Sequence, residues 1–212
     1  MKRRNFSVGM AFSAFGFSAI LPKKSFAIGE QRQMTAVFQQ LEAKAQGRLG
    51  VDVIDTATGH EFGYRSDELF MMLSSFKLLA SALVLARADR GEESLTRRIR
   101  YRKQDLVPWS PVTEANADGE GLTLAQLCHA TITTSDNTAG NLILASYGGP
   151  QALTQYARQL GDKVTRLDRN EPDLNTRVEG GNLDTTSPRA MAMTMNKLLL
   201  GDALSPSSRN LL

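Results

Sequence analysis

Strand-like alternation of apolar and polar residues occurs in only one part of this 212-residue chain. Residues 49–55 (Leu-Gly-Val-Asp-Val-Ile-Asp) alternate like a half-buried strand, and residues 60–64 read as the returning strand of a hairpin. A two-stranded hairpin is barely stable alone, and no comparable strand pattern follows Tyr64. The pattern therefore predicts a small sheet near the start, sheet partners outside this sequence, and a mainly helical remainder.

The rest of the chain has the apolar spacing of helices. Residues 76–90 form a continuous apolar segment closed by Gly91, which predicts a central, buried helix. A capping box, Thr123-Leu124-Ala125-Gln126, begins a second helical stretch that breaks at Ser135. Further helices are expected at 31–45, 137–147, 151–160 and 188–200, and a last one opens at Ser205-Pro206. Residues 95–118 are expected to be loops and short turns. Residues 166–185 are polar and aperiodic, and a loop of that length in a compact domain is usually functional or disordered.

The first 27 residues have the pattern of an export signal. A basic start at residues 2–4 precedes a mildly apolar run at 8–21 and a small-x-small cleavage site, Ser25-Phe26-Ala27. The apolar run is too short for a membrane span, and the absence of a nearby cysteine argues against a lipid anchor. Residues 3–6 (Arg-Arg-Asn-Phe) also resemble a twin-arginine signal, so the Sec and twin-arginine routes both stay open. We expect a signal peptide at 1–27 and a periplasmic or secreted protein.

The net charge of +3 belongs to this leader. Five of the 25 basic residues precede Ile28 and no acidic residue precedes Glu30, so 20 basic residues face 22 acidic ones afterwards, a net charge of −2. This balance gives no sign of nucleic-acid binding. With 42% hydrophobic residues the chain can bury an ordinary globular core, and we expect a monomer.

The small number of cysteine and histidine residues limits the disulfides, metal sites and catalytic bases that the chain can form. Cys128 is the only cysteine, so no internal disulfide can form, and its apolar neighbours predict a buried small side chain. His60 and His129 are the only histidines, and no CxxC or HExxH pattern occurs, so we expect no metal and no other cofactor. A hydrolase built from this sequence needs a general base other than histidine.

Ser74-Ser75-Phe76-Lys77 stands at the start of the predicted buried helix. Ser74 and Lys77 are three residues apart and share a helix face, so the amine can reach the hydroxyl. A serine hydroxyl needs such a base to act as a nucleophile, and burial lowers the pKa of a lysine enough for it to serve. The donors at a helix start also suit an oxyanion. Alone, the pattern is common at helix starts.

Two further motifs follow. Ser135-Asp136-Asn137 lies at the break between two helical stretches, where the same residue types also serve as caps. In the aperiodic loop, Glu171 precedes a proline and Asn175 follows four residues later. A carboxylate and an amide at this spacing can hold a water between them, with the carboxylate as its general base, although a plain charged turn would look similar.

In this order, the three motifs make the chain resemble the class A serine β-lactamase family from about Gln31 to Leu212. Arg169 and Asp184 fall where the family closes its omega loop with an ion pair, and 184–188 fit the segment after that loop. The resemblance implies an α/β fold of the α+β type: a helical domain plus an antiparallel sheet flanked by helices, as in β-lactamases and transpeptidases. In the family, further strands and a terminal helix would follow Leu212.

The resemblance implies a role for each catalytic residue. Ser74 would open the β-lactam ring and become acylated, with its backbone N–H in the oxyanion hole. Lys77 would activate Ser74, and Ser135 would pass a proton to the departing ring nitrogen. Glu171 would orient the deacylating water, and in the family the peptide bond before Pro172 is cis. Whether Lys77 or Glu171 takes the proton during acylation stays open at this point.

The resemblance also implies a set of substrate-binding residues. Asn137 would position Lys77 and the side-chain amide of the substrate, and Asn175 would help Glu171 to hold water. Trp109 falls where the family carries an aromatic residue at the rim of the cleft. Asp136 is expected to be structural.

The sequence departs from the family pattern at two places. Some members join the position of Cys128 to a second cysteine, but Ser81 stands there in this chain. More importantly, the family binds the substrate carboxylate with a Lys-[Ser/Thr]-Gly triplet on a sheet edge, and no such triplet occurs in this chain. We therefore expect a partial sequence that by itself exposes part of its core and has little or no activity.

The expected function is hydrolysis of penicillins or cephalosporins through a serine acyl-enzyme, which confers antibiotic resistance. A penicillin-binding D-Ala-D-Ala peptidase shares the Ser-x-x-Lys logic but lacks the deacylating glutamate. A β-lactam sensor would also lack that loop and would need a membrane segment. An inactive remnant of the lactamase family is the third alternative.

We expect a signal peptide at 1–27, the first α/β segment at 28–70, a mainly helical domain at 71–200 with the omega loop at 169–184, and the start of a return to the α/β domain at 201–212.

Overall fold

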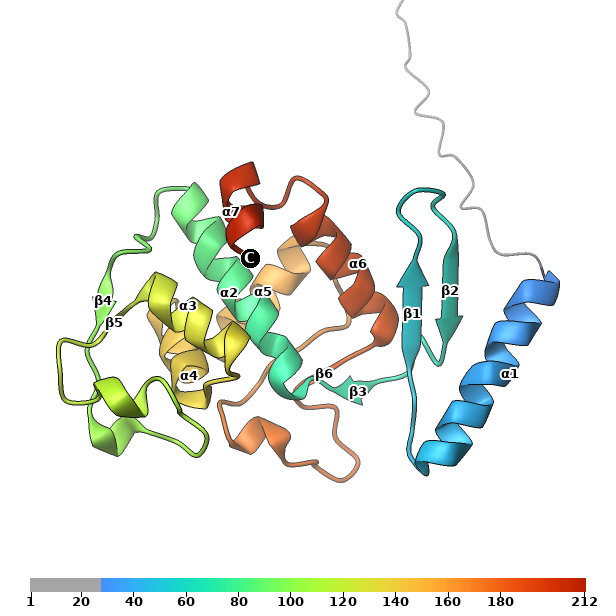
Figure 1. The fold of residues 1–212 in the computed structure, drawn as a ribbon, viewed down its shortest axis with the longest axis horizontal. Helices are drawn as coiled ribbons and strands as arrows, with labels where there is room; N and C mark the ends of the chain where they lie inside the picture. The colour runs from blue at the N-terminus through green and yellow to red at the C-terminus, as the bar shows by residue number, and fades with distance from the viewer. Residues whose placement is uncertain (1–27) are drawn as a thin grey trace, which may run out of the picture.

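The computed structural model describes residues 28–212, so the expected signal peptide lies outside the described residues. Helix α1 (Ile28–Ala45) leads to a hairpin of β1 (Val51–Ile54) and β2 (Glu61–Tyr64) (Figure 1). The two strands pair antiparallel with Val51 opposite Tyr64, and the N–H of Gly59 closes the turn on the carbonyl of Asp55 at 2.7 Å. The hairpin predicted from alternation is therefore confirmed.

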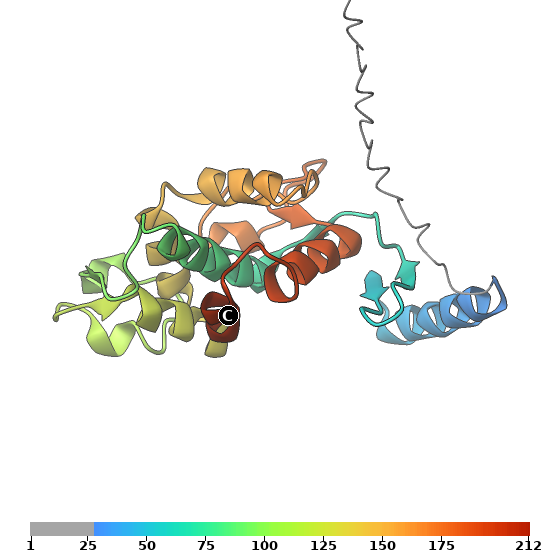
Figure 2. The ribbon, with the colours of Figure 1, turned by 90° about the horizontal axis from the view of Figure 1, so that it is seen from above.

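Helix α1 covers one face of this hairpin. Phe38 stacks on Phe62 and Tyr64 with ring centroids 5.6 and 6.0 Å apart. Met34, Val37 and Leu41, on the same helix, are exposed. Figure 2 shows α1 and the hairpin together at one end of the molecule, beside a larger helical body.

The helical body is built around α2 (Phe76–Asp89), most of whose residues are buried. The other helices agree with the sequence expectation to within two residues: α3 (Leu124–Thr133), α4 (Asn137–Ser146), α5 (Pro150–Gln159), α6 (Pro188–Leu199) and α7 (Pro206–Leu211). Thr123 and Gln126 form the expected capping box of α3. Apolar side chains of α2 pack with those of α3, α4 and α5 into one core, which includes Phe76, Leu79, Leu124, Leu127, Ile143, Leu144 and Leu153.

Among the described residues, four very short strands follow Tyr64, where the sequence shows no comparable strand pattern. β3 (Phe70–Met71) pairs with β6 (Thr185–Thr186), and β4 (Arg98–Ile99) pairs with β5 (Leu122–Thr123). Strands of two residues show no alternation, because they are fixed by their tertiary partners and not by a local pattern. The described residues also include four 3₁₀ helices: η1 (Leu73–Ser75), η2 (Lys103–Asp105), η3 (Glu114–Asn116) and η4 (Asp173–Asn175).

The hairpin is joined to the helical body at α6 and through β3. Helix α6 lies against β1, and β3 continues from the hairpin into η1 and α2 (Figure 1). Within residues 28–212, β1 pairs with β2 alone. Among the described helices, none combines the length and apolar character needed to cross a membrane. The division into segments at 28–70 and 71–200 stays a prediction.

Candidate active site

Ser74 lies in the short η1 turn that leads directly into α2, and its side chain is exposed. The β3–β6 pair precedes this turn, and the N–H of Met72 donates to the carbonyl of Asp184 at 2.8 Å. Leu73, immediately before Ser74, has a φ of 46°, in the left-handed region. The nucleophile candidate is therefore held between the end of the 169–184 loop and the start of the buried helix.

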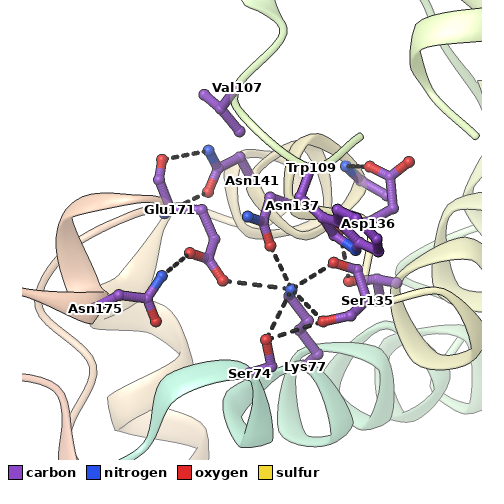
Figure 3. A network of polar contacts seen from close by, with 12 residues as sticks. Ser74, Lys77, Val107, Trp109, Ser135, Asp136, Asn137, Asn141, Glu171 and Asn175 are labelled. Carbon is purple, nitrogen blue, oxygen red and sulfur yellow. Dashed lines mark hydrogen bonds and ion pairs between the residues drawn. The ribbon is translucent and has the colours of Figure 1, made fainter. Parts of the chain in front are cut away.

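Lys77 lies beneath Ser74 on the first turn of α2 and is only 2% exposed. Its Nζ is 3.2 Å from Ser74 Oγ, as the Ser-x-x-Lys spacing predicted. The same Nζ donates to the Ser135 carbonyl at 2.8 Å, Ser135 Oγ at 2.9 Å and Asn137 Oδ1 at 2.6 Å (Figure 3). It also forms an ion pair with Glu171 Oε1 at 3.3 Å. One amine thus joins all three sequence motifs.

Burial changes the protonation of Lys77. Removal of this ammonium from water lowers its pKa, and the nearby negative charge of Glu171 only partly opposes that effect. Because the lowered pKa favours the neutral amine, Lys77 is suited to accept a proton from Ser74.

The Ser-Asp-Asn motif stands at the start of α4, with Asp136 as its N-cap. The Asp136 carboxylate is fully buried and accepts hydrogen bonds from the N–H groups of Val112, Thr113 and Ala139 and from the Thr113 hydroxyl. These bonds fix the turn so that the residues on either side of Asp136 face Lys77. Ser135 Oγ donates to Ser74 Oγ at 2.9 Å, which places a second hydroxyl beside the nucleophile.

Asn137 and Trp109 connect this motif to the preceding loop. Asn137 Nδ2 donates to the Pro108 carbonyl at 2.9 Å, and its backbone N–H donates to the Trp109 carbonyl at 2.9 Å. The Trp109 side chain is 67% exposed, and its ring N–H donates to the Thr134 carbonyl at 2.9 Å. The ring therefore stands beside Asn137 at the solvent side of the site (Figure 3).

The 169–184 loop is closed by the expected ion pair. Arg169 Nε lies 2.6 Å from Asp184 Oδ2, and the Asp184 side chain is fully buried. Asp184 Oδ1 accepts the backbone N–H groups of Asp168 and Arg169 at 2.7 and 2.9 Å. Arg169 Nη2 also donates to the Thr176 carbonyl at 2.8 Å, which ties the middle of the loop to its closure.

This loop brings Glu171 to Lys77. Glu171 is 4% exposed, and the peptide bond to Pro172 is cis, as the resemblance implied. Asn175 Nδ2 donates to Glu171 Oε2 at 2.5 Å, so the amide predicted to assist the glutamate contacts it directly. The other oxygen, Oε1, faces Lys77.

Asn141 is a site residue that sequence reasoning missed. Its Nδ2 donates to the Glu171 carbonyl at 2.9 Å, and its Oδ1 accepts the Glu171 N–H at 2.9 Å (Figure 3). This pair of bonds fixes the backbone of the glutamate to α4. Asn141 follows Asn137 by four residues, so it lies one turn further along the same helix face, and that spacing was the available signal.

Cys128 lies away from the catalytic cluster. Its thiol is free, it shares the lining of one pocket with Ser81, and burial raises its pKa to about 11. A thiol with such a pKa stays protonated and unreactive near neutral pH. Within residues 28–212, no group of three or more His, Cys, Asp or Glu side chains could hold a metal ion.

The seven residues predicted for the site come together around Lys77 and its neighbours: Ser74, Lys77, Ser135, Glu171, Asn137, Asn175 and Trp109. The cluster has an exposed hydroxyl, an amine with a lowered pKa beneath it, a second hydroxyl beside it, and a buried carboxylate on the opposite side of the amine. Such a set can activate a serine, protonate a leaving group and activate a water.

Comparison with known proteins agrees with this chemistry. The model of the Beta-lactamase enzyme family matches residues 31–212. An ancestral class A β-lactamase (GNCA) has a similar structure, with a TM-score of 0.82 and 57% sequence identity over 84% of this chain and 68% of that chain. The structure of the putative class A β-lactamase PenP from Rhodopseudomonas palustris gives a TM-score of 0.82 and 55% identity over the same shares of the two chains.

The match covers nearly all of the described residues, and the fold and the order of the motifs agree with it. The chain therefore belongs to the β-lactamase enzyme family as a class A member, and its reaction is the hydrolysis of β-lactams.

Proposed function

We propose that Ser74 opens the β-lactam ring and carries the acyl group, and that Glu171 directs its release by water. The observation that carries this proposal is the position of Lys77, whose Nζ contacts Ser74, Ser135 and Glu171 at once. No other described lysine joins a serine hydroxyl to a buried carboxylate in this way.

Acylation follows from the contacts of Ser74. Its Oγ bonds to the ring carbonyl carbon, while the backbone N–H of Ser74 stabilises the oxyanion. The hydroxyl proton moves to the Lys77 amine when that amine is in its deprotonated form, which its lowered pKa favours, and the two atoms are 3.2 Å apart. When the carbon–nitrogen bond of the ring breaks, Ser135 gives its proton to the nitrogen and regains one from Lys77 at 2.9 Å.

Deacylation uses the opposite side of the site. Glu171 takes a proton from a water held between its carboxylate and the Asn175 amide, and the water oxygen bonds to the ester carbonyl carbon. The ester bond to Ser74 breaks and the proton returns to Ser74 Oγ. The Asn141 and Asn175 contacts support this role because they fix the backbone and the side chain of Glu171.

Export and antibiotic resistance are further parts of the proposal. The basic and apolar pattern of residues 1–27 supports removal of a signal peptide after Ala27 and a periplasmic location, where β-lactams act. N-terminal sequencing of the exported protein should begin at Ile28. A mature protein that retains Lys23 and Lys24 would contradict this part.

The catalytic proposal is tested with Glu171→Gln and mass spectrometry of the intact chain incubated with benzylpenicillin. We expect a covalent adduct of penicillin mass on Ser74, with hydrolysis of that adduct slowed about 100-fold or more in the variant, because general-base catalysis contributes 10²–10⁴-fold. The measurement detects a single slow acylation and does not depend on turnover.

Glu114→Gln is the matched control, because Glu114 is an exposed glutamate in η3 that is not one of the site residues. It should leave the lifetime of the adduct unchanged. An adduct that survives Ser74→Ala would contradict the assignment of the nucleophile. An equally long-lived adduct in the unaltered chain and in Glu171→Gln would favour a penicillin-binding peptidase instead.

A further inference from the structure

A closed ring of hydrogen bonds ties the loop that carries Trp109 to the first turn of α4. Ser110 and Thr138 are 6% and 1% exposed, and their hydroxyl oxygens lie 2.7 Å apart. The Val107 N–H donates to Thr138 Oγ1 at 2.9 Å, and Ser110 Oγ donates to the Val107 carbonyl at 2.7 Å. Two buried hydroxyls therefore hold both backbone groups of Val107. The hydroxyl ring, as it is called below, consists of Val107, Ser110 and Thr138.

The direction of each bond in the hydroxyl ring is fixed by the chemistry of its members. A backbone N–H only donates and a carbonyl only accepts, whereas a hydroxyl has one proton to give. Because Ser110 gives its proton to the Val107 carbonyl, the contact between the two hydroxyls uses the proton of Thr138. The backbone N–H of Thr138 also donates to Ser110 Oγ at 3.3 Å. Loss of either hydroxyl therefore leaves a backbone group of Val107 without its partner.

The hydroxyl ring supports a strained turn. Pro108 and Trp109 lie between Val107 and Ser110, and Trp109 has a φ of 65°, in the left-handed region. For a residue with a bulky side chain this conformation is unfavourable, and it persists only where the surrounding contacts over-determine it. The hydroxyl ring supplies such contacts at both ends of the turn. Backbone strain of this kind is concentrated at functional sites, so the purpose of the turn is to be sought in what it contacts.

The strained turn presents two consecutive carbonyls to Asn137. The Pro108 carbonyl accepts from Asn137 Nδ2 at 2.9 Å, and the Trp109 carbonyl accepts from the backbone N–H of Asn137 at 2.9 Å. Because a carbonyl can only accept, the Pro108 contact decides which end of the side-chain amide faces it. The amide oxygen is left to face Lys77, from whose Nζ it accepts at 2.6 Å. In Figure 3, Asn137 stands between Val107 and Lys77.

We propose that Ser110 and Thr138 are positioning residues for acylation, which hold the turn so that the amide oxygen of Asn137 faces the catalytic amine. The inference rests on the proposed attack by Ser74 with Lys77 as its base. Without the hydroxyl ring the strained turn relaxes, and the amide can rotate so that its Nδ2 faces the amine instead. The amine then loses an acceptor that helps to keep it 3.2 Å from Ser74 Oγ. Small displacements of reacting groups slow a reaction strongly.

The hydroxyl ring is expected to affect acylation and not deacylation. Glu171, which directs the release of the acyl group, is held by Asn141 and Asn175. None of these contacts includes a residue of the hydroxyl ring. Loss of a hydroxyl should therefore slow the formation of the acyl-enzyme and leave its lifetime unchanged, a separation that a general loss of stability would not produce.

Thr138→Val is the decisive variant, because valine has nearly the shape of threonine and lacks the hydroxyl. Mass spectrometry of the intact chain follows the acylation of Ser74 by benzylpenicillin and the lifetime of the adduct. We expect acylation to slow by about tenfold or more, with no change in the lifetime. Thr138→Ser keeps the hydroxyl and should restore the rate of acylation. Ser110→Ala breaks the hydroxyl ring at the Val107 carbonyl and should slow acylation without changing the lifetime.

Thr194→Val is the matched control. Thr194 is 2% exposed in α6, and its hydroxyl donates to Asp162 Oδ2 at 3.2 Å. This control should lower the unfolding temperature and leave acylation unchanged. The inference is overturned if Thr194→Val slows acylation as much as Thr138→Val does, because loss of stability would then explain both. It is also overturned if Thr138→Val is acylated as fast as the unaltered chain.

A second measurement does not depend on catalysis. In the chain without ligand, NMR measures how fast the side-chain amide protons of Asn137 exchange with water, which the bond to the Pro108 carbonyl slows. Thr138→Val should accelerate this exchange about tenfold, and Thr194→Val should not. If the unaltered chain forms no adduct, the proposed role of Ser74 fails, and the amide exchange decides this inference alone. Faster exchange in Thr138→Val then supports it, and equal exchange overturns it.

Discussion

Lys77 shows how a single residue determines the chemistry of the site. Its amine is almost completely removed from water and is surrounded by oxygens of Ser74, Ser135, Asn137 and Glu171. Burial favours the neutral amine, while Glu171 favours the charged one. The pKa is lowered because the burial effect is larger, and the same effect adapts the residue to accept a proton.

The lowered pKa of Lys77 predicts how stability varies with pH. Above the folded-state pKa and below 10.5, the unfolded chain binds the lysine proton more tightly than the folded chain does. The free energy of unfolding therefore gains a contribution that rises with pH and is complete above 10.5. The free energy of unfolding of the unaltered chain and of Lys77→Met is measured by urea denaturation at several pH values. The value for the unaltered chain minus that for Lys77→Met should increase as pH rises. A difference that stays constant from pH 7 to pH 10 would contradict the lowered pKa.

At the scale of single elements, the conformation of the 169–184 loop is held by the contacts that close it more than by its own secondary structure. Apart from η4, it contains no helix or strand, and Leu174 is its fully buried apolar side chain. The Asp184 carboxylate provides the closure, because its two oxygens accept two backbone N–H groups and the Arg169 guanidinium. Any loosening there moves Glu171 relative to Lys77.

Asp184→Asn should loosen this loop. The amide cannot pair with Arg169 as an anion, so we expect a loss of about 1–3 kcal/mol in the free energy of unfolding and slower release of the acyl group from Ser74. Hydrogen exchange of the loop amides and the lifetime of the penicillin adduct measure the two effects. The control is Asp173→Asn, at an exposed position in the same loop, which should change neither.

At the scale of the whole molecule, one arginine connects the hairpin to the helical body. Arg189, in the first turn of α6, donates from Nε to Asp67 at 2.8 Å and from Nη2 to Ser66 Oγ at 2.9 Å. Its Nη1 forms an ion pair with Glu61 of β2 and lies 3.7 Å from Asp52 of β1, whose side chain is fully buried. Arg189 thus joins both strands and the following linker to α6.

Arg189→Met should free the hairpin from the helical body. We expect the free energy of unfolding to fall by about 1–3 kcal/mol, because the buried carboxylate of Asp52 and its neighbour Glu61 lose a nearby cation. Amide exchange should rise at Val53 and Phe62 and stay unchanged at Leu127 and Ile143 in the helical core. Arg100→Met, which removes an exposed ion pair with Glu120, should have almost no effect. Equal acceleration of exchange in both regions would show that Arg189 acts on global stability alone.

The sequence by itself determined the hairpin and six of the seven helices in residues 28–212 to within two residues. It also singled out seven candidate site residues, which the structure brings together around Lys77. These features leave local signals: alternation with period two, apolar spacing with period 3.6, capping residues, and short motifs whose side chains share a helix face. The start of α1 extends before the expected Gln31, because helix ends depend on weak local preferences.

Only the tertiary structure decided the rest. The pairings of β3 with β6 and of β4 with β5 join segments far apart in the chain, and strands of two residues leave no pattern to read. The contacts of Asn141 with Glu171 and of Arg189 with the hairpin likewise join residues distant in sequence. Local patterns report which face of an element is apolar, whereas packing alone decides which distant element covers that face and which polar groups meet there.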